Sequence, residues 1–256
     1  MAISNTESRY SRIWSTCVKS ISTILLLAIA VSVLYPLFWT ITSSIRDSTL
    51  FFQNPWRLPE RLDFSVYDKV WTDHFIKYAL FNSIRISVLT VCLSLLITLP
   101  AAYAISRMQS RFSELALAFF LMGLMIPGHS TIIPLYLSLV PIIDIVGPKY
   151  AIIIPYVAGT LPISIFILTN FMRTIPNSLE EAAVIDGCSV PKVFYKIVLP
   201  VSLPAVATVS IFNFLGVWNE LMLALVFLSK NTDQTLPLSM LRFSGLKTPD
   251  ALNVHG

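Results

Sequence analysis

Charged residues are absent from five long stretches of this chain. Each stretch is 21 to 29 residues long and contains no Asp, Glu, Lys or Arg. About 20 consecutive apolar residues form a helix that crosses the ~30 Å hydrocarbon layer of a bilayer. Because the stretches are continuously apolar and do not alternate, they indicate helices and not barrel strands. The sequence therefore predicts an all-α, polytopic helical membrane protein with five spans, at residues 20–45, 86–106, 115–143, 150–172 and 197–219.

The composition excludes a water-soluble enzyme. Hydrophobic residues make up 55% of the chain and charged residues 12%, whereas soluble domains carry about 25% charge. There is too little polar surface to cover a soluble domain of this size. The formal net charge is +4, but the basic residues are scattered between apolar blocks and form no patch. A nucleic-acid-binding protein is therefore not indicated.

The first uncharged stretch has two interpretations. Basic residues up to Lys19 precede it, and Ala28-Ile29-Ala30 lies within it, which is compatible with a cleaved signal peptide. The apolar core of a signal peptide is 7–15 residues long, whereas this stretch stays apolar through Trp39. Its length favours a retained membrane anchor.

The third stretch is longer than one span needs, and it contains Pro127-Gly128 and two further prolines. Proline kinks or breaks a helix, which membranes tolerate where neighbouring groups satisfy the freed backbone. We expect a helix from about Leu115 to Met125, followed by a broken continuation towards Asp144. Kinked packing explains these prolines more simply than a gated pathway does.

The loop at residues 173–196 carries the pattern of two short helices. Ser178 and Glu181 have the spacing of a capping box, and Gly187 occupies the position where a left-handed residue ends a helix. Ser189 then provides the cap of a second helix. The sequence predicts a short helix, a tight glycine turn and a second helix that leads back into the bilayer.

A helix of about nine residues is marginal alone in water, so we expect this one to pack against another surface. Its small Ala182-Ala183 surface allows close approach to a groove. That shape suits docking on another protein at the membrane face. A well-capped connector without a partner is the alternative.

The same loop matches a family signature. Glu181-Ala182-Ala183, three residues, Gly187, nine residues and Ile197-Val198-Leu199-Pro200 reproduce the pattern EAA-x3-G-x9-I-x-L-P at every fixed position. In this pattern the chain resembles the membrane subunits of binding-protein-dependent ABC importers, and the similarity extends over most of the chain from about Asn82 onward. The segment Gly216-Val217-Trp218-Asn219-Glu220 is similar to the carbohydrate branch of that family, and within it to the smaller, maltose-permease-like subunit.

This resemblance implies the type I ABC importer permease fold and a non-catalytic permease subunit of an ATP-driven sugar importer. The partners would be a second permease in a heterodimer, two ATPase subunits, an extracytoplasmic sugar-binding protein and the lipid bilayer. ATP and Mg²⁺ would lie on the ATPases, with no cofactor on this chain. The loop would be cytoplasmic, which places the N-terminus in the cytoplasm of a prokaryotic cell, with the chain multi-pass in its membrane.

The resemblance also implies which residues meet the ATPase. The first helix of the loop would sit in a cleft of that subunit, and the second would set the return into the membrane. The residues so implied are Glu180, Glu181, Ala182, Ala183, Asp186, Gly187, Ile197, Leu199 and Pro200.

Two domains follow from the same resemblance: an anchor span with an extracytoplasmic segment at 1–81, and the importer transmembrane domain at 82–256. Members of the family normally have a further span after the segment that corresponds to 229–250. The sequence ends at Gly256 without a sixth apolar run. We therefore expect five of six spans, a C-terminally truncated domain, and a carboxyl end outside the cell.

Residues near the end of the fifth span are candidates for the substrate path. Glu220 interrupts an apolar region, and intramembrane acids are functional by default. A position at the outer interface is the simpler interpretation, because Glu220 follows nearly a full span. Asn213, Asn219 and Trp218 have groups that suit a sugar, although interhelical hydrogen bonds are the commoner role of such amides.

Other functional classes have less support. An ion-coupled secondary transporter, with Glu220 as the ion ligand, is the main alternative, and no constellation for a hydrolase is present. The sequence contains no G-x-x-x-x-G-K-[ST] pattern, so ATP would be hydrolysed by a partner. The histidines and cysteines lack the spacing of a metal site or a disulfide framework. These residues are His74, His129, His255, Cys17, Cys92 and Cys188.

Overall fold

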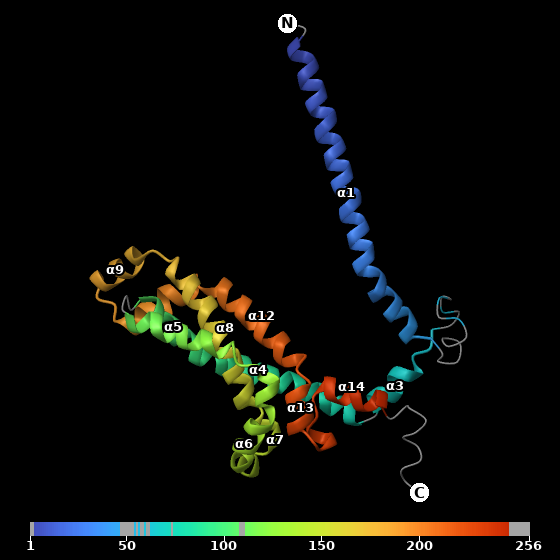
Figure 1. Cartoon of the computed structure of the whole chain (residues 1–256), viewed down its shortest axis with the longest axis vertical. Coiled ribbons are helices and arrows are strands. Elements are labelled where there is room, and N and C mark those ends of the chain that lie inside the picture. Colours follow the sequence, from blue (N-terminus) through green and yellow to red (C-terminus); the bar gives the residue numbers. More distant parts are fainter. Residues whose placement is uncertain are drawn as a thin grey trace. The chain divides into compact units, whose positions relative to one another are not determined.

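The computed structural model describes residues 3–46, 54, 56, 59, 62–72, 74–107 and 111–245. These residues form helices, turns and short extended segments and contain no strand, which confirms the predicted all-α class (Figure 1). The chain divides into two compact units, Met1–Thr72 and Asp73–Gly256.

The first unit contains helices α1 (Ile3–Ser44) and α3 (Ser65–Thr72). Residues Val18–Ser44 of α1 are long and apolar enough to cross a bilayer, and this span is not buried by the rest of the chain. The hydroxyl groups of Ser44 and Tyr67 lie 2.5 Å apart, which links the end of α1 to α3. An apolar helix exposed on all sides suits a lipid environment.

The second unit contains the remaining helices. In chain order they are α4 (His74–Arg107), α5 (Arg111–Gly123), η1 (Gly128–Thr131), α6 (Ile132–Val146), α7 (Pro148–Ala151), α8 (Ile153–Arg173), α9 (Asn177–Ile185), α10 (Val190–Val193), the π-helical η2 (Phe194–Val198), α11 (Leu199–Val201), α12 (Leu203–Trp218), α13 (Met222–Phe227), η3 (Asn231–Asp233) and α14 (Leu236–Gly245). The predicted boundary between the two domains, at residues 81 and 82, lies within α4, which is continuous there.

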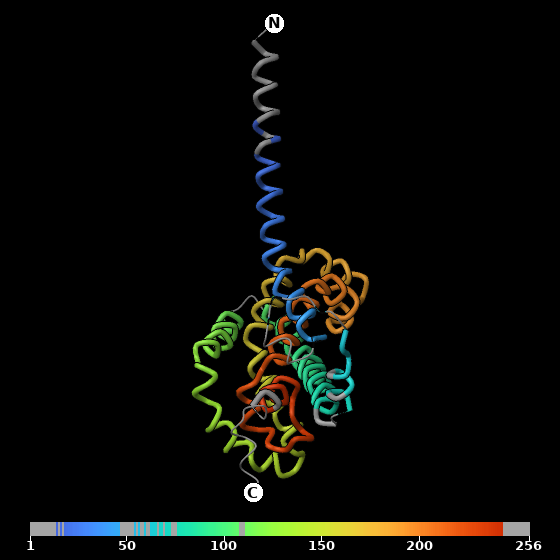
Figure 2. The backbone as a smooth tube through the Cα atoms, turned by 90° about the vertical axis from the view of Figure 1, so that its right-hand side faces the viewer, coloured from blue at the N-terminus to red at the C-terminus, as the bar shows by residue number. Residues whose placement is uncertain are grey.

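Helix α4 is the centre of this unit and packs along both α8 and α12 (Figure 1). In Figure 2 the orange turns that include α9 lie at one end of the unit, and the red turns of α13 and α14 lie towards the other. The packed face of α4 includes a row of small residues, all at most 2% exposed and repeating every three or four positions. They are Ala79, Ser83, Ser87, Thr90, Ser94, Thr98 and Ala102. Small side chains allow membrane helices to approach closely.

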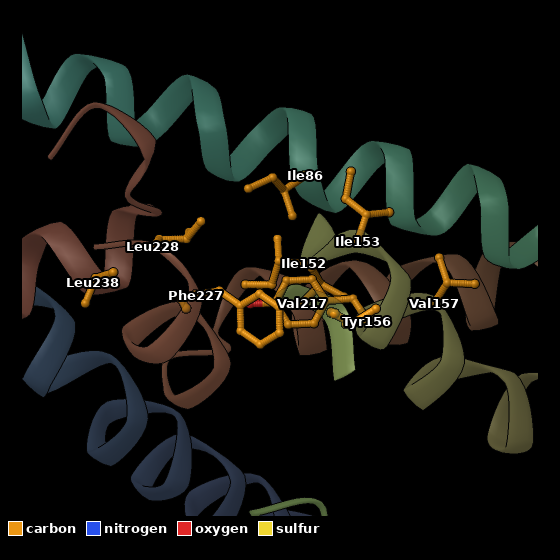
Figure 3. Packing of buried hydrophobic residues seen from close by; sticks show 11 residues of the cluster. Ile86, Ile152, Ile153, Tyr156, Val157, Val217, Phe227, Leu228 and Leu238 are labelled. Atoms are coloured by element: carbon orange, nitrogen blue, oxygen red, sulfur yellow. The ribbon is translucent and has the colours of Figure 1, made fainter. Parts of the chain in front are cut away.

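Two apolar clusters fill the unit. One lies where α4, α6, α8 and the segment after α12 meet, and Figure 3 shows Ile152, Tyr156 and Phe227 converging beneath α4. The other lies near α9 and includes Met172 and Phe194. Each cluster therefore fixes one end of the helix bundle.

The number of spans agrees with the expectation of five. Four helical segments are long and apolar enough to cross a bilayer, and a bent pair of helices makes a fifth candidate. The four segments are Val18–Ser44, Ile76–Arg107, Gly128–Val146 and Pro148–Arg173.

Helices α5 and α6 together make one crossing. Arg107, at the end of α4, donates from Nη2 to the carbonyl oxygen of Ile175, just after α8, at 3.3 Å. Helices α4 and α8 therefore end on the same side, and because α8 crosses once, the chain between them also crosses once. The helical chain breaks between Gly123 and Gly128, so the predicted helix with a broken continuation is confirmed.

The predicted fifth span, at 197–219, is not one straight helix. The segment from α10 to α11 meets α12 at an angle of 74°. At the break the Ser202 hydroxyl donates to a carbonyl one turn earlier at 2.7 Å. Pro200 and Pro204, on either side, lack the N–H groups that a regular helix uses. The predicted fifth span is therefore bent, and its straight part begins at Leu203.

The packed face of α4 generates a testable prediction. Thr90 is fully buried there and its Oγ1 has no hydrogen-bond partner in the described structure. Thr90→Leu should lower the stability by about 1–3 kcal/mol because it overpacks a close contact. Thermal unfolding in detergent measures the change. Thr90→Val, of the same shape, should be tolerated because it removes only an unpaired hydroxyl; equal tolerance of leucine would contradict close packing.

Candidate functional site

Helix α9 begins two residues earlier than the sequence suggests, since the predicted N-cap is Ser178. Its N-cap is Pro176, which makes no side-chain hydrogen bond to the helix, and Asn177 is its first residue. Ser178 therefore lies inside the first turn, and the expected capping box between Ser178 and Glu181 is wrong. The extended backbone of Pro176 starts the helix without a capping side chain.

The end of α9 is as expected. Gly187 has φ +79°, in the left-handed region that favours glycine. The N–H of Cys188 donates to Ala183 O and that of Gly187 donates to Val184 O, both at 2.9 Å. These two bonds make a Schellman motif, which satisfies the last carbonyl groups of the helix and reverses the chain.

The second half of the loop continues from this turn. Ser189 occupies the N-cap position of α10, as predicted, but its side chain makes no capping hydrogen bond. Ile197 and Leu199 are half-buried and Pro200 is exposed. These three residues lie in the bent segment that precedes Ser202, so they position the return to α12.

Glu180 fastens α9 to α4. Arg107 donates from Nε to Oε1 of Glu180 at 2.5 Å, and the Tyr103 hydroxyl donates to Oε2 at 2.9 Å. The side chains of Arg107 and Glu180 are only 17% and 14% exposed, so solvent screens this ion pair less than a surface pair. Ala183 is buried in the neighbouring apolar cluster. Two residues of the implied coupling set, Glu180 and Ala183, thus face the chain's own helices.

The C-terminal part of α9 and the residue after it present an outward surface, which we define as Glu181, Ala182, Val184, Ile185 and Asp186; all five are exposed. Val184 and Ile185 were not predicted from the sequence, although they are 56% and 85% exposed. Apolar side chains exposed beside charged ones are typical of a contact surface. The sequence signal for these two residues is an apolar pair that lies outside any span and shortly before the turn at Gly187.

A shallow groove of about 460 Å³ runs beside this surface. Its lining combines two apolar side chains at the C-terminal end of α9 with three charged side chains. The lining residues are Arg107, Asn177, Glu180, Glu181, Val184 and Ile185.

A second hollow lies between α8 and α12, with a volume of about 520 Å³. Its lining is mostly apolar, and its polar groups come from Tyr156, Thr160, Asn213 and Glu220. Two of the predicted substrate-path residues, Asn213 and Glu220, are therefore brought to the same hollow, which we call the α8–α12 pocket.

Asn213 also joins three helices at the base of this pocket. Its Nδ2 donates to Ser164 Oγ of α8 at 2.9 Å and to Ser94 Oγ of α4 at 3.3 Å. Thr160 of α8 donates to the same Ser94 oxygen at 3.0 Å. Asn213 is 3% exposed, so its amide makes the interhelical hydrogen bonds that are usual for such residues.

Glu220 stabilises the start of α13. Its carboxylate accepts hydrogen bonds from the Tyr156 hydroxyl at 2.8 Å and from the N–H groups of Leu223 and Ala224 at 2.9 and 3.2 Å. Carboxylates at this position satisfy free N–H groups and the helix dipole. Three hydrogen-bond donors of the protein thus contact the Glu220 carboxylate, which would be the ligand of a coupling ion.

The other two predicted path residues do not line the α8–α12 pocket. Trp218 stacks on Phe214, with ring centroids 5.6 Å apart. The Asn219 amide is exposed and donates to Leu215 O of its own helix at 2.8 Å. Both lie on different faces of α12 from Asn213.

Among the described residues, no three His, Cys, Asp or Glu side chains lie close enough to hold a metal ion. Cys92 is exposed and Cys188 is half-buried, and neither forms a disulfide. The side chains of Cys17, His74 and His255 lie outside the described part.

Known proteins resemble this chain over most of its length. Residues 94–244 match a family described as "Binding-protein-dependent transport system inner membrane component". The chain is 42% identical, over 81% of its length and 74% of the relative's, to the "Putative ABC transporter permease protein ORF2" of Caldicellulosiruptor sp. (strain Rt8B.4). It is 32% identical, over 85% and 78%, to the "Trehalose/maltose transport system permease protein MalG" of Thermococcus litoralis.

A solved structure is similar as well. It is described as the crystal structure of "a bacterial ABC transporter involved in the import of the acidic polysaccharide alginate". The TM-score is 0.74 at 26% identity, and the match covers 91% of this chain and 82% of the other.

The Schellman turn predicts a specific cost at Gly187. Gly187→Ala should destabilise the end of α9 by about 1–2 kcal/mol because a Cβ disfavours the left-handed backbone. Hydrogen exchange of the amides of residues 183–188 should accelerate accordingly. Gly159→Ala is the matched control, since this glycine lies within α8 and its Cβ would contact no atom within 4 Å. Unchanged exchange in Gly187→Ala would contradict the turn.

The interhelical cluster predicts a cost at Asn213. Asn213→Leu should lower stability by about 1 kcal/mol, the scale of interhelical hydrogen bonds in membranes. Thermal unfolding in detergent tests this. Ser210→Ala, on the same helix, removes only a bond to its own helix, to Val206 O, and should have no effect. A larger loss in Ser210→Ala than in Asn213→Leu is the contrary result.

Proposed function

Because the chain belongs to the family of inner membrane components of binding-protein-dependent transport systems, we propose that it is the permease subunit of an ATP-driven sugar importer. Relatives of the chain include permeases named for trehalose/maltose and for diacetylchitobiose, which supports a sugar or oligosaccharide as cargo. The chain is a non-catalytic, multi-pass membrane subunit. It binds no cofactor itself; a partner subunit binds ATP and Mg²⁺.

One observation carries the proposal: α9 is held inward by Glu180 and Ala183 and presents an outward surface of apolar and acidic residues. Such a surface, rigid at its glycine end, suits insertion into a groove of a partner. The partner is an ATPase subunit, which contacts Glu181, Ala182, Asp186 and Gly187 together with Val184 and Ile185. Ile197, Leu199 and Pro200 transmit its movement towards α12.

The complete importer contains a second permease in a heterodimer, two ATPase subunits and an extracytoplasmic sugar-binding protein. With α9 in the cytoplasm, α4 begins outside, and the single crossing of α1 places the N-terminus in the cytoplasm as well. Residues 1–81 supply the anchor and an extracytoplasmic segment, and residues 82–256 supply the translocation domain.

The α8–α12 pocket is the portion of the substrate path that this chain provides. Its apolar walls and the polar groups of its lining suit a sugar, which has apolar ring faces and polar edges. Asn213 and Glu220 shape these walls through their own hydrogen bonds. Trp218 and Asn219 lie on other faces of α12 and contribute where the second permease completes the path.

Ile185 provides the test. Ile185→Glu should reduce capture of the co-expressed ATPase in mild detergent at least tenfold, because it places a charge in an apolar contact. Ile145→Glu is the matched control: Ile145 is 82% exposed against 85% for Ile185 and lies at the end of α6. Undiminished ATPase capture by Ile185→Glu, or equal loss in the control, would overturn the proposed docking.

A further inference from the structure

Two adjacent acids at the start of α9 have different surroundings. Glu181 is exposed, whereas both carboxylate oxygens of Glu180 are held by α4. We propose that Glu180 is not an ATPase contact but a positioning residue that, with Tyr103 and Arg107, transmits the displacement of α9 directly to α4. This inference rests on the proposed function, in which the ATPase moves α9. We call Tyr103, Arg107 and Glu180 the α4 latch.

The latch is built to resist rotation. Tyr103 and Arg107 are four residues apart on α4, so they lie on one face, one turn from each other. They bind different oxygens of the same carboxylate, and Arg107 also donates to Ile175 O in the connector between α8 and α9. Two hydrogen bonds to one carboxylate of α9 and a third to the connector restrain the orientation of α9 more than a single bond does.

The latch links α4 to α9, which the backbone does not connect directly. Helix α8 is joined covalently to α9 by a short connector, and α12 is joined through residues 186–202. Helix α4 has no neighbouring covalent link to this loop, so side chains must carry any force between them. The ring of Tyr103 also packs on Phe194 of η2, with centroids 5.0 Å apart. The end of α4 therefore contacts both halves of the loop.

The opposite end of α4 is anchored too. Asn82 donates from Nδ2 to the carbonyl oxygens of Thr232 and Gln234 at 2.9 and 3.1 Å. Ser83 Oγ accepts the N–H of Leu236 at 2.7 Å. About 36 Å of helix separates these bonds from Arg107, at 1.5 Å per residue. A displacement that enters at Glu180 thus reaches the segment around η3 through one continuous helix.

The experiment measures whether α9 and α4 move as one body. Spin labels are placed at Ser178→Cys on α9 and Leu96→Cys on α4, both exposed positions, after Cys17, Cys92 and Cys188 are replaced by serine. The complete importer is studied in nanodiscs, nucleotide-free and trapped with ATP and vanadate. The distance distribution between the labels should be unchanged by trapping in the chain with an intact latch.

Latch variants should behave differently. In Arg107→Ala and in Glu180→Gln, trapping should shift the distance, because α9 then moves without α4. The charge-swapped double variant, Arg107→Glu with Glu180→Arg, should return the distance towards its unshifted value, which a general loss of structure would not allow. Lys192→Gln, at an exposed charged residue of the same loop that belongs to neither the latch nor the outward surface of α9, should show no shift.

Capture of the ATPase is measured in the same preparations. It should be retained by Arg107→Ala and Glu180→Gln. Loss of the ATPase from Glu180→Gln would overturn the latch and make Glu180 a partner contact. A shift in the intact chain as large as in the variants would also overturn the latch but leave the proposed function standing. Absence of the ATPase from the intact chain would overturn both.

Discussion

Close contact between α4 and its neighbours α8 and α12 is the interaction on which this structure depends. In lipid, apolar side chains gain little from meeting each other, so helix association relies on tight packing and polar contacts. The small residues of α4 from Ala79 to Ala102 provide the tight packing. The hydroxyl of Ser94, hydrogen-bonded to Thr160 and Asn213, provides the polar contacts. Both sites described above rest on this core: α9 is fastened to one end of α4, and the α8–α12 pocket opens beside it.

The loop after α8 combines a fixed side with an exposed side. Ala183 and Glu180 hold α9 to the protein, while Val184 and Ile185 remain in solvent. The Schellman turn at Gly187 ends the helix without disturbing either side. A short helix of this kind is unstable alone, so its stability comes from the same contacts that set its orientation.

Local rules predicted the features that depend on local sequence. Uncharged runs located the spans, the prolines near Pro127 located the break before α6, and Gly187 located the end of α9. The features that failed depend on tertiary neighbours. Glu180 and Glu181 are indistinguishable in the sequence, because Arg107, which separates their roles, lies 73 positions away. The 74° bend at Ser202 lies between Pro200 and Pro204, and an uncharged run cannot show a bend.

The bend at Ser202 has a consequence for the surrounding lipid. Helix α12 contains 16 residues, or roughly 24 Å at 1.5 Å per residue, against a hydrocarbon thickness of about 30 Å. Polar groups stand at its two ends, in Ser202 and Asn219. A helix shorter than its bilayer makes the membrane thin locally. We therefore expect bilayer thickness to act on this protein at α12, which lines the α8–α12 pocket.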